Sequence, residues 1–230
     1  MPGLIANVVA VIIGAFLGLF IRNGLSVRFK SMVTNAIGLS CLFIGAAGAF
    51  RGLLGDSSHP VLFIVSLVIG GLLGEFIDLD ARINGFGLMV ERKMGTEGFA
   101  KGFVAASLFF NVGSMAVIGS LEAGLMGSYN TLFAKSTLDG VTAVVLAASY
   151  GFGVIFSAAT ILLYQGALIL LAQVIAPFMT DDALRELSIV GGILVFAIGI
   201  DMLAIKKLKV ANFLPSLIVP VIYYSVITSF

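Results

Sequence analysis

Charged side chains are scarce in this sequence: only 11% of its 230 residues are Asp, Glu, Lys or Arg. A soluble globular domain carries about 25% charged and about 45–50% apolar residues. Here 60% of the residues are hydrophobic, and the mean hydropathy is +1.15. So few charges cannot cover a water-facing surface, which excludes a soluble domain and predicts an integral membrane protein.

Cysteine and histidine are almost absent, because Cys41 and His59 are the sole residues of their types. One cysteine cannot close an internal disulfide. One cysteine and one histidine cannot build a zinc site, a histidine-based triad or a Cys–His pair within one chain. No phosphate-binding loop follows a predicted strand either. We therefore expect no enzyme activity, no metal and no cofactor.

A basic surface is lacking as well. The 13 Lys and Arg residues stand against 12 Asp and Glu residues, which gives a net charge of +1. Nucleic-acid binding needs a basic face that neutralises phosphates. Nucleic acid is therefore excluded as a partner, and the lipid bilayer is the expected environment.

The apolar residues form long runs that short polar clusters separate. A helix needs about 20 residues to cross a hydrocarbon core of about 30 Å. The first run lacks a basic segment before it, so we interpret it as a retained span and not as a signal peptide. The predicted spans are residues 3–21, 33–50, 60–77, 99–121, 138–151, 153–178, 184–205 and 213–229. The fold class is thus an all-α, polytopic transmembrane helical bundle of about eight spans, one membrane domain over residues 1–230.

The basic residues predict the orientation, since Lys and Arg concentrate in cytoplasmic loops. With eight spans, one set of loops holds ten of them: Arg22, Arg28, Lys30, Arg82, Arg92, Lys93, Lys101, Lys206, Lys207 and Lys209. The opposite loops hold three: Arg51, Lys135 and Arg185. This bias predicts a multi-pass membrane protein with both termini outside. If residues 138–151 only dip into the membrane, the split falls to eight against five.

The segment between the third and fourth spans carries too many charges to cross a membrane. Ile83, Phe86 (or Gly87) and Val90 recur at helical spacing within residues 79–94. This pattern predicts a short amphipathic helix on the cytoplasmic surface. A plain charged linker is the alternative.

Glycine is abundant, and several pairs have the spacing that lets helices approach closely. Gly14 with Gly18 and Gly70 with Gly74 are predicted to be helix-packing positions. They serve packing inside one bundle or, alternatively, the seam of a homo-oligomer. Glycines of the second span, at positions 38 and 45, match those at 192 and 199 in the seventh. An inverted repeat is one explanation, and chance similarity is the other.

Polar residues on the fourth to sixth spans are the candidate functional residues. Within each of these spans the polar residues fall on one face of the helix. The polar faces of the three spans could therefore converge on one cavity. The transport-path candidates are Asn111, Ser114, Glu122, Lys135, Asp139, Ser149, Tyr164 and Gln165. The alternative is that these groups only join helices, a role in which each hydrogen bond contributes about 0.6 kcal/mol. Asp201 is either functional or paired with Lys206.

The stretch from Phe110 to Gly166 carries a resemblance to a known family. It contains the segments Phe110-Asn111-Val112-Gly113-Ser114, Ser136-Thr137-Leu138-Asp139-Gly140, Gly151-Phe152-Gly153 and Tyr164-Gln165-Gly166. Asn7 with Gly14 and Gly18, and Gly70 to Glu75 with Asp78, extend the similarity to the first and third spans. The sequence resembles the YqgA/YdfK-like bacterial membrane proteins (domain of unknown function 554). The resemblance implies a membrane protein and a suspected transport function, without a substrate.

The leading hypothesis is therefore a small secondary transporter or channel-like permease for an unknown small solute or ion. No catalytic set is visible, while polar residues gather on helices that could face one another. The main alternative is a non-transporting assembly or regulatory partner protein in the membrane, and an intramembrane enzyme ranks third. A water-filled cavity would favour transport, and a dry bundle with an exposed face of small residues would favour the partner protein.

Overall fold

The structure is a computed structural model that describes residues 1–24, 27–54, 60–94, 98–111 and 114–227. Within these ranges the chain is helical and has no strand, which confirms the predicted all-α class. The elements are α1 (Pro2–Gly24), α2 (Val27–Leu53), α3 (Pro60–Ile77), α4 (Leu79–Met94), α5 (Phe99–Asn111), α6 (Ser114–Leu125), α7 (Asn130–Tyr150), α8 (Gly153–Leu170), α9 (Ala172–Ile175), the 3₁₀ helix η1 (Ala176–Phe178), α10 (Asp181–Met202), the 3₁₀ helix η2 (Val210–Leu217) and α11 (Ile218–Ile227).

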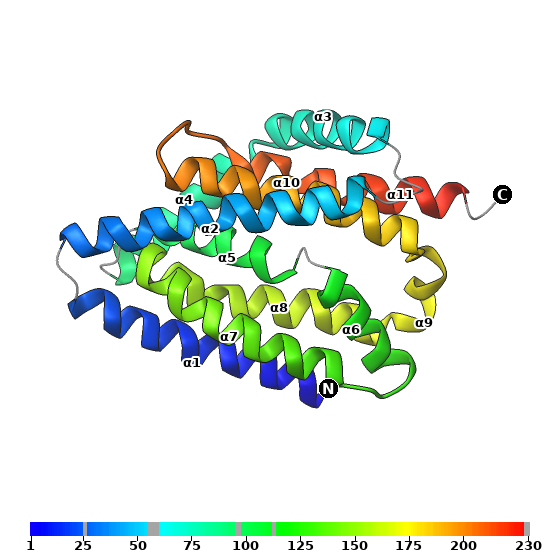
Figure 1. Cartoon of the computed structure of the whole chain (residues 1–230), viewed down its shortest axis with the longest axis horizontal. Coiled ribbons are helices and arrows are strands. Elements are labelled where there is room, and N and C mark those ends of the chain that lie inside the picture. Colours follow the sequence, from blue (N-terminus) through cyan, green and yellow to red (C-terminus); the bar gives the residue numbers. More distant parts are fainter. Residues whose placement is uncertain (25–26, 55–59, 95–97, 112–113, 228–230) are drawn as a thin grey trace.

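Among the described residues, five helices are long and apolar enough to cross a membrane: α1, α2, α7, α8 and α10. The number rises to seven if the bent pairs α3–α4 and α5–α6 each form one span. The eighth predicted span falls on η2 and α11, a shorter apolar segment. The chain runs back and forth along the long axis of the molecule, and α11 lies toward the right-hand side of Figure 1.

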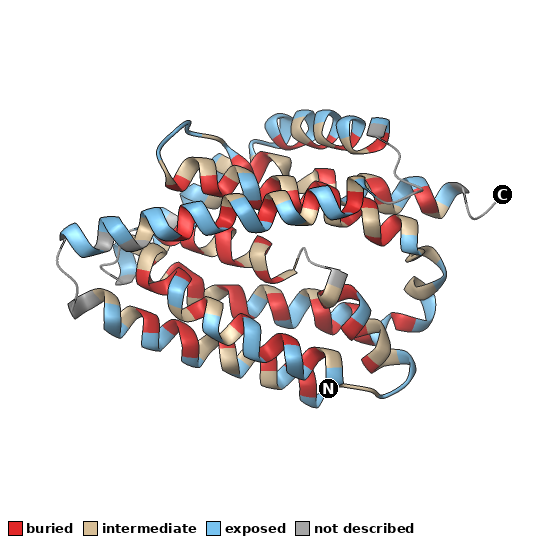
Figure 2. Cartoon of the chain, in the orientation of Figure 1, coloured by how far each residue is buried: buried red, intermediate tan, exposed pale blue. Residues whose placement is uncertain are grey.

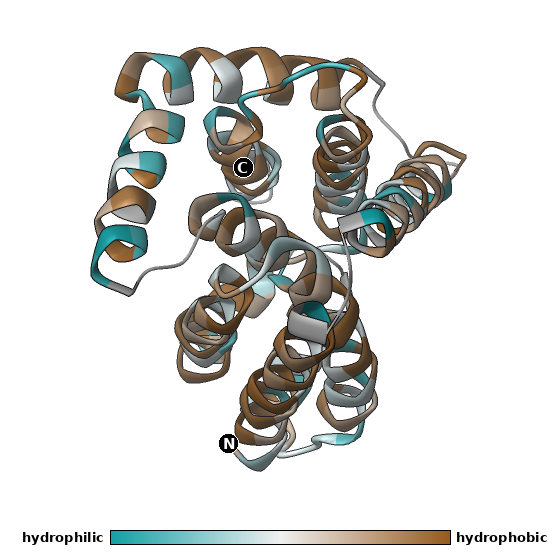
Figure 3. Cartoon of the chain, turned by 90° about the vertical axis from the view of Figure 1, so that its left-hand side faces the viewer, coloured by the Kyte–Doolittle hydropathy of each residue, from teal (hydrophilic) through white to brown (hydrophobic). Residues whose placement is uncertain are grey.

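Large apolar side chains cover the outside of the bundle. Phe43 on α2 and Phe76 on α3 are 76% and 90% exposed. Figure 2 places many exposed residues on the outward faces of α1, α2 and α3, and hydrophobic residues colour the outside of the bundle in Figure 3. An apolar outer surface of this extent suits hydrocarbon and not water, in agreement with the composition.

The helices α1 and α7 run parallel and form the most extensive helix pair. A Cβ added to Gly14 would collide with the carbonyl oxygen of Gly140, and one added to Gly18 with that of Val144. The two glycines therefore open a groove on α1 that receives the backbone of α7. Two further glycines lie at the turn between α7 and α8. Gly151, with a φ of +84°, follows the last residue of α7, and Gly153 is the first residue of α8. The predicted break at Gly151-Phe152-Gly153 is confirmed.

The helices α2 and α10 form the second extensive pair and run antiparallel. Gly45 meets Gly192, and a Cβ added to Gly199 would lie 2.7 Å from the carbonyl oxygen of Gly38. The glycines that suggested an internal repeat thus face one another across this seam. Their shared role in packing accounts for the similarity of the two helices, and the inverted repeat itself stays a prediction.

Several predicted spans differ from the observed helices. The sixth, residues 153–178, is divided among α8, α9 and η1, and the seventh, residues 184–205, corresponds to α10 at Asp181–Met202. The fourth, residues 99–121, is divided into α5 and α6, whose axes differ by 59°. The fifth was expected to be short and to begin at Leu138, but α7 begins at Asn130 and is 21 residues long. The hydropathy of its first turns is low because of Lys135 and Asp139. Both side chains are buried by neighbouring helices, so the helix extends through them.

The helix α3 packs on η2 at the outer edge of the bundle, at the top of Figures 1 and 3. A Cβ at Gly70 would collide with Ser216, and one at Gly74 with the carbonyl oxygen of Asn212. The predicted amphipathic helix 79–94 is α4, with the predicted bounds, bent by 49° from α3. The plain linker is excluded, because this segment is helical and carries exposed Arg82, Arg92 and Lys93.

Candidate functional site

Four polar side chains meet between α1, α7 and α8: Asn7, Lys135, Asp139 and Gln165, called the buried polar cluster below. Lys135 Nζ lies 2.7 Å from Asp139 Oδ2 and 3.0 Å from Oδ1. The Asn7 amide donates a 3.0 Å hydrogen bond to Asp139 Oδ2 and a 3.4 Å hydrogen bond to Gln165 Oε1. Asn7 and Gln165 are fully buried, and the Lys135 and Asp139 side chains are each 7% exposed.

Two amide atoms of the cluster have no hydrogen-bond partner. They are Asn7 Oδ1 and Gln165 Nε2, both buried. A buried donor or acceptor left unpaired costs about 1–3 kcal/mol, and burying an ion pair is often no net gain because both charges leave water. Packing stability therefore does not explain the cluster. Ionisable groups at membrane depth are functional-site candidates by default.

Glu122, on α6, lies apart from Asp139. Its Oε2 accepts a 2.6 Å hydrogen bond from Thr131 Oγ1. Thr131 precedes Lys135 by one helical turn on α7, so Glu122 lies beside the first turn of that helix. At that end the N-terminal ammonium of Met1 donates a 2.7 Å hydrogen bond to the Tyr129 hydroxyl.

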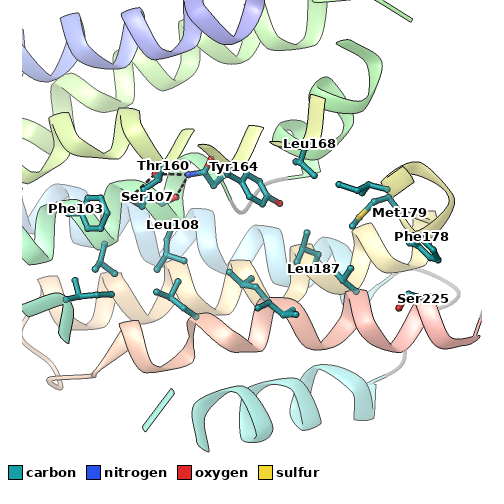
Figure 4. A pocket seen from close by; sticks show the side chains of 18 of the residues that line it. Phe103, Ser107, Leu108, Thr160, Tyr164, Leu168, Phe178, Met179, Leu187 and Ser225 are labelled. Atoms are coloured by element: carbon teal, nitrogen blue, oxygen red, sulfur yellow. Dashed lines mark hydrogen bonds between the residues drawn. The ribbon is translucent and has the colours of Figure 1, made fainter. Parts of the chain in front are cut away.

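Asn111 ends α5 and belongs to a second polar group. Its amide donates hydrogen bonds of 3.0 Å to the Ser107 carbonyl oxygen and 3.1 Å to Thr160 Oγ1. Thr160 in turn donates to Ser107 Oγ over 3.1 Å, and Asn111 Oδ1 is buried without a partner. Figure 4 shows Ser107 and Thr160 of this group on the wall of a cavity, with Tyr164 beside them.

That cavity, cavity 1, has a volume of about 1000 Å³ and lies between α5, α8, η1 and η2–α11. Its wall is mostly apolar, with Ser107, Asn111, Thr160 and Tyr164 among the polar residues. A second cavity of about 590 Å³, cavity 2, is lined by Lys101, Lys207 and Asp201 among others. Both cavities have Ile83 and Val104 on their walls. They are therefore neighbours, and together they reach from the basic end of the bundle to Asn111.

A third cavity of about 440 Å³, cavity 3, lies on the other side of the break. Phe109 on α5 and Ile118 on α6 belong to its wall, as do Arg51 and Arg185. Arg51 is near the end of α2 and Arg185 near the start of α10, opposite the end that holds Lys101 and Lys207. The α5–α6 break thus has cavities on two sides that extend toward opposite ends of the bundle.

Charge pairs surround the basic end. Lys101 pairs with Asp201 at 3.0 Å, so Asp201 does not need Lys206 as its partner. Lys209 pairs with Glu75 at 2.7 Å. The hydrogen bond to the Glu75 carboxylate raises the pKa of Lys209, which keeps this ammonium charged at the mouth of cavity 2.

The predicted site residues divide among five places. Asn111 and Tyr164 line cavity 1, whereas Lys135, Asp139 and Gln165 belong to the buried polar cluster. Glu122 lies at the start of α7, and Ser149 Oγ is buried without a partner at the opposite end of that helix. Ser114 begins α6, and its side chain lies outside the described residues. The sequence-based candidates did not include Asn7 or Arg51. Asn7 could have been found as the one strongly polar residue inside the first span.

The residues that the structure describes contain no group of three or more His, Cys, Asp or Glu that could hold a metal ion. The side chains at the sites described above are amides, hydroxyls and single carboxylate–ammonium pairs, which can bind and orient solutes or monovalent ions.

Comparisons with known proteins agree with this architecture. The chain is 38% identical to "Uncharacterized membrane protein YdfK" of Bacillus subtilis (strain 168), over 100% of this chain and 98% of the relative. It is 29% identical to "Uncharacterized protein YqgA" of Escherichia coli (strain K12), over 92% and 91% of the two chains. No solved structure matches it. Residues 2–225 match the family described as "Protein of unknown function (DUF554)", and the chain, a helical membrane protein, belongs to that family.

Proposed function

We propose that this protein is a small secondary transporter or channel-like permease of the bacterial inner membrane, with both termini outside. The solute would pass the break between α5 and α6. The observation that carries this proposal is the set of cavities around the break. Cavities 1 and 2 extend to it from the basic end, and cavity 3 approaches it at Phe109 and Ile118 from the other end.

The broken helix supports the same function. Secondary transporters commonly build their solute site at interrupted helices near the membrane midplane, where helix ends expose backbone groups. Here Asn111 ends α5 beside Ser107 and Thr160, and Asn111 Oδ1 lacks a partner. A solute donor group would satisfy that oxygen.

The proposed route differs from the one expected from the sequence. Lys135, Asp139 and Gln165 are absent from the walls of the three cavities, whereas Asn111 and Tyr164 line cavity 1. The alternative function, a non-transporting partner protein, has less support. It would use the glycine-rich faces for contacts, but Gly14, Gly18 and Gly74 already pack on helices of the same chain.

Water access to cavity 1 tests the proposal without a known solute. Cys41→Ala removes the native thiol, and Thr160→Cys then places one on the cavity wall. A membrane-impermeant thiol reagent applied to inside-out vesicles should modify this residue through cavity 2. The control is Ala147→Cys, at a fully buried position packed against Gly18, which should stay unmodified. If Thr160→Cys is as unreactive as the control, the bundle is dry there and transport along this route is excluded.

Flux provides the second step. A thermal-shift screen of ions and metabolites identifies a bound solute, whose uptake into proteoliposomes is then measured. Asn111→Leu should abolish or strongly reduce uptake at equal incorporation, because it removes the polar group at the break. Phe43→Leu, on the lipid-facing side of α2, should transport like the wild type. A solute that binds the wild-type protein and never crosses the membrane would favour the partner protein instead.

A further inference from the structure

The buried polar cluster remains unexplained by a route through the cavities. It contains a carboxylate and an ammonium, each 7% exposed, and two fully buried amides with unpaired atoms. Glu122 lies one turn farther out, on Thr131. Lys135 already neutralises Asp139, whereas the half-buried Glu122 makes no ion pair among the described residues. A second cation at Asp139 would therefore leave Lys135 free to neutralise Glu122.

Oxygen atoms from two helices flank the Asn7 amide of a third. Asp139 Oδ2 and Gln165 Oε1 both accept a hydrogen bond from Asn7 Nδ2, over 3.0 and 3.4 Å. Rotation of this amide by half a turn exchanges Nδ2 for Oδ1, which has no partner, and turns a third oxygen toward the other two. Carboxylate and amide oxygens are the ligands that hard cations prefer. A carboxylate can also take up a proton. We propose that Asp139, Asn7 and Gln165 form a binding site for one monovalent cation, Na⁺ or H⁺, which the Lys135 ammonium occupies in this structure.

Lys135 can leave the site without losing its counterion. Its side chain extends from the turn between Thr131 and Asp139, and Glu122 contacts Thr131 over 2.6 Å. Residues one turn apart on a helix are neighbours, so the ammonium can swing outward from Asp139 to Glu122. The incoming cation then neutralises Asp139, and the whole group becomes electrically neutral. If the cation is a proton, it forms an O–H bond on the Asp139 carboxylate, and no other bond changes.

Few other charges act on Asp139. The helix α1 contributes Asn7 and, at its exposed end, the Met1 ammonium bound to Tyr129. The helix α6 contributes Glu122, and α8 contributes Gln165 with the neighbouring Tyr164. Among the described residues, α2 and α5 also pack on α7 but place no hydrogen bond or ion pair on Asp139. The exchange of cations therefore depends chiefly on Lys135 and Glu122.

The role of this site rests on the proposed function, since a bound cation would drive the solute through the cavities. Cation binding itself needs no solute and can be measured on the purified protein. Thermal unfolding in detergent, followed by circular dichroism, is compared in sodium chloride and in choline chloride of equal ionic strength, each in alkaline and in acidic buffer. A bound cation should raise the wild-type Tm by about 2–4 °C. A rise in sodium identifies Na⁺, and a rise in acidic choline identifies H⁺.

Three variants separate a cation site from a structural ion pair. Lys135→Met removes the ammonium that occupies the site. The apparent dissociation constant of this variant for the cation should be roughly tenfold lower than that of the wild type, because no ammonium has to leave before the cation binds. Asp139→Asn should abolish the response. Asp182→Asn, which removes the half-buried ion pair with Arg185 at the start of α10, should respond like the wild type.

The contrary result is that the Tm of the wild-type protein does not change between the four buffers and that the Tm of Lys135→Met does not change between them either. The pair would then serve packing alone, and the inference would be overturned even if solute flux is found. Conversely, a cation response without any solute flux would leave the cation site intact and remove the proposed transport function. The two proposals can therefore fail separately.

Discussion

Gly45 of α2 and Gly192 of α10 touch through their backbones. A Cβ added to Gly45 would lie 2.6 Å from the carbonyl oxygen of Gly192, and a Cβ added to Gly192 would lie 2.7 Å from that of Gly45. Real Cβ atoms essentially never approach a neighbour so closely. Membrane helices associate through such close packing, because the lipid chains are as apolar as the helix surfaces and the hydrophobic effect does not drive the helices together. This contact therefore holds the α2–α10 pair together.

Gly192→Ala should destabilise the protein by about 1–3 kcal/mol, because the added methyl group forces the two backbones apart. The measurement is the shift of the thermal unfolding midpoint in detergent. Gly85→Ala on α4 is the matched control, because no atom lies within 4 Å of its added Cβ. In this control alanine should be neutral or slightly stabilising, since glycine is the poorer helix former. Equal midpoints for Gly192→Ala and the control would mean that α2 and α10 do not pack as described.

Gly74→Leu should separate α3 from η2. The Cβ alone would collide with the carbonyl oxygen of Asn212, and Asn212 also donates a 2.5 Å hydrogen bond to Glu75 and accepts one of 2.6 Å from the backbone N–H of Asp80. We expect a loss of about 1–3 kcal/mol and easier proteolysis between α3 and α4. An unchanged midpoint and cleavage pattern would place this face of α3 against lipid.

Removing one partner of the Lys135–Asp139 pair should cost more than removing both. Lys135→Met or Asp139→Leu alone leaves a buried charge unpaired, at a cost of about 3–5 kcal/mol. The double variant leaves no charge, so its loss should be far smaller than the sum of the single losses. A double-mutant cycle, measured in choline at alkaline pH so that no other cation fills the site, gives the coupling. Additive losses would indicate that the two side chains do not form a buried pair.

The distribution of basic residues predicts that Lys207 is cytoplasmic and that both termini are external. In the Cys41→Ala background, a cysteine at position 207 should react with an impermeant reagent only in inside-out vesicles. A cysteine added after Phe230 should react only in intact spheroplasts. Labelling of position 207 from outside, with none at the C-terminus, would contradict the eight-span topology.

Several boundaries follow from the sequence alone. Pro60 starts α3 because its missing N–H is not needed in a first helical turn, and α3 has the predicted bounds of residues 60–77. The charges after Ile77 end the apolar run, so the amphipathic α4 could also be predicted. Gly151 adopts a positive φ that other residues rarely adopt, and it separates α7 from α8 as expected. These features depend on interactions within one segment.

The starts of α7 and α10 were predicted less well. Hydropathy placed the start of the fifth span at Leu138, but Lys135 and Asp139 neutralise each other inside the bundle and let α7 begin at Asn130. The helix α10 begins at Asp181, because Thr180 caps it by accepting a 3.2 Å hydrogen bond from the Ala183 N–H. The carboxylates of Asp181 and Asp182, in the first turn, also stabilise this end of the helix by their interaction with the positive end of the helix dipole. The average hydropathy of a segment contains no information on buried ion pairs or on helix caps, so neither start could be predicted from it.

That this is a helical membrane protein follows from its composition and from the length of its apolar runs, because these decide which segments can reside in hydrocarbon. Which polar residues meet depends instead on how the helices pack. Asn111 and Tyr164 line a cavity, whereas Gln165, one residue farther along α8, joins Asn7 and Asp139 on another face. Because many helix faces have similar hydropathy, the sequence of one helix does not show which other helix each of its faces packs against. Close backbone approaches such as those at Gly14 and Gly192, between residues far apart in the chain, set which faces come together.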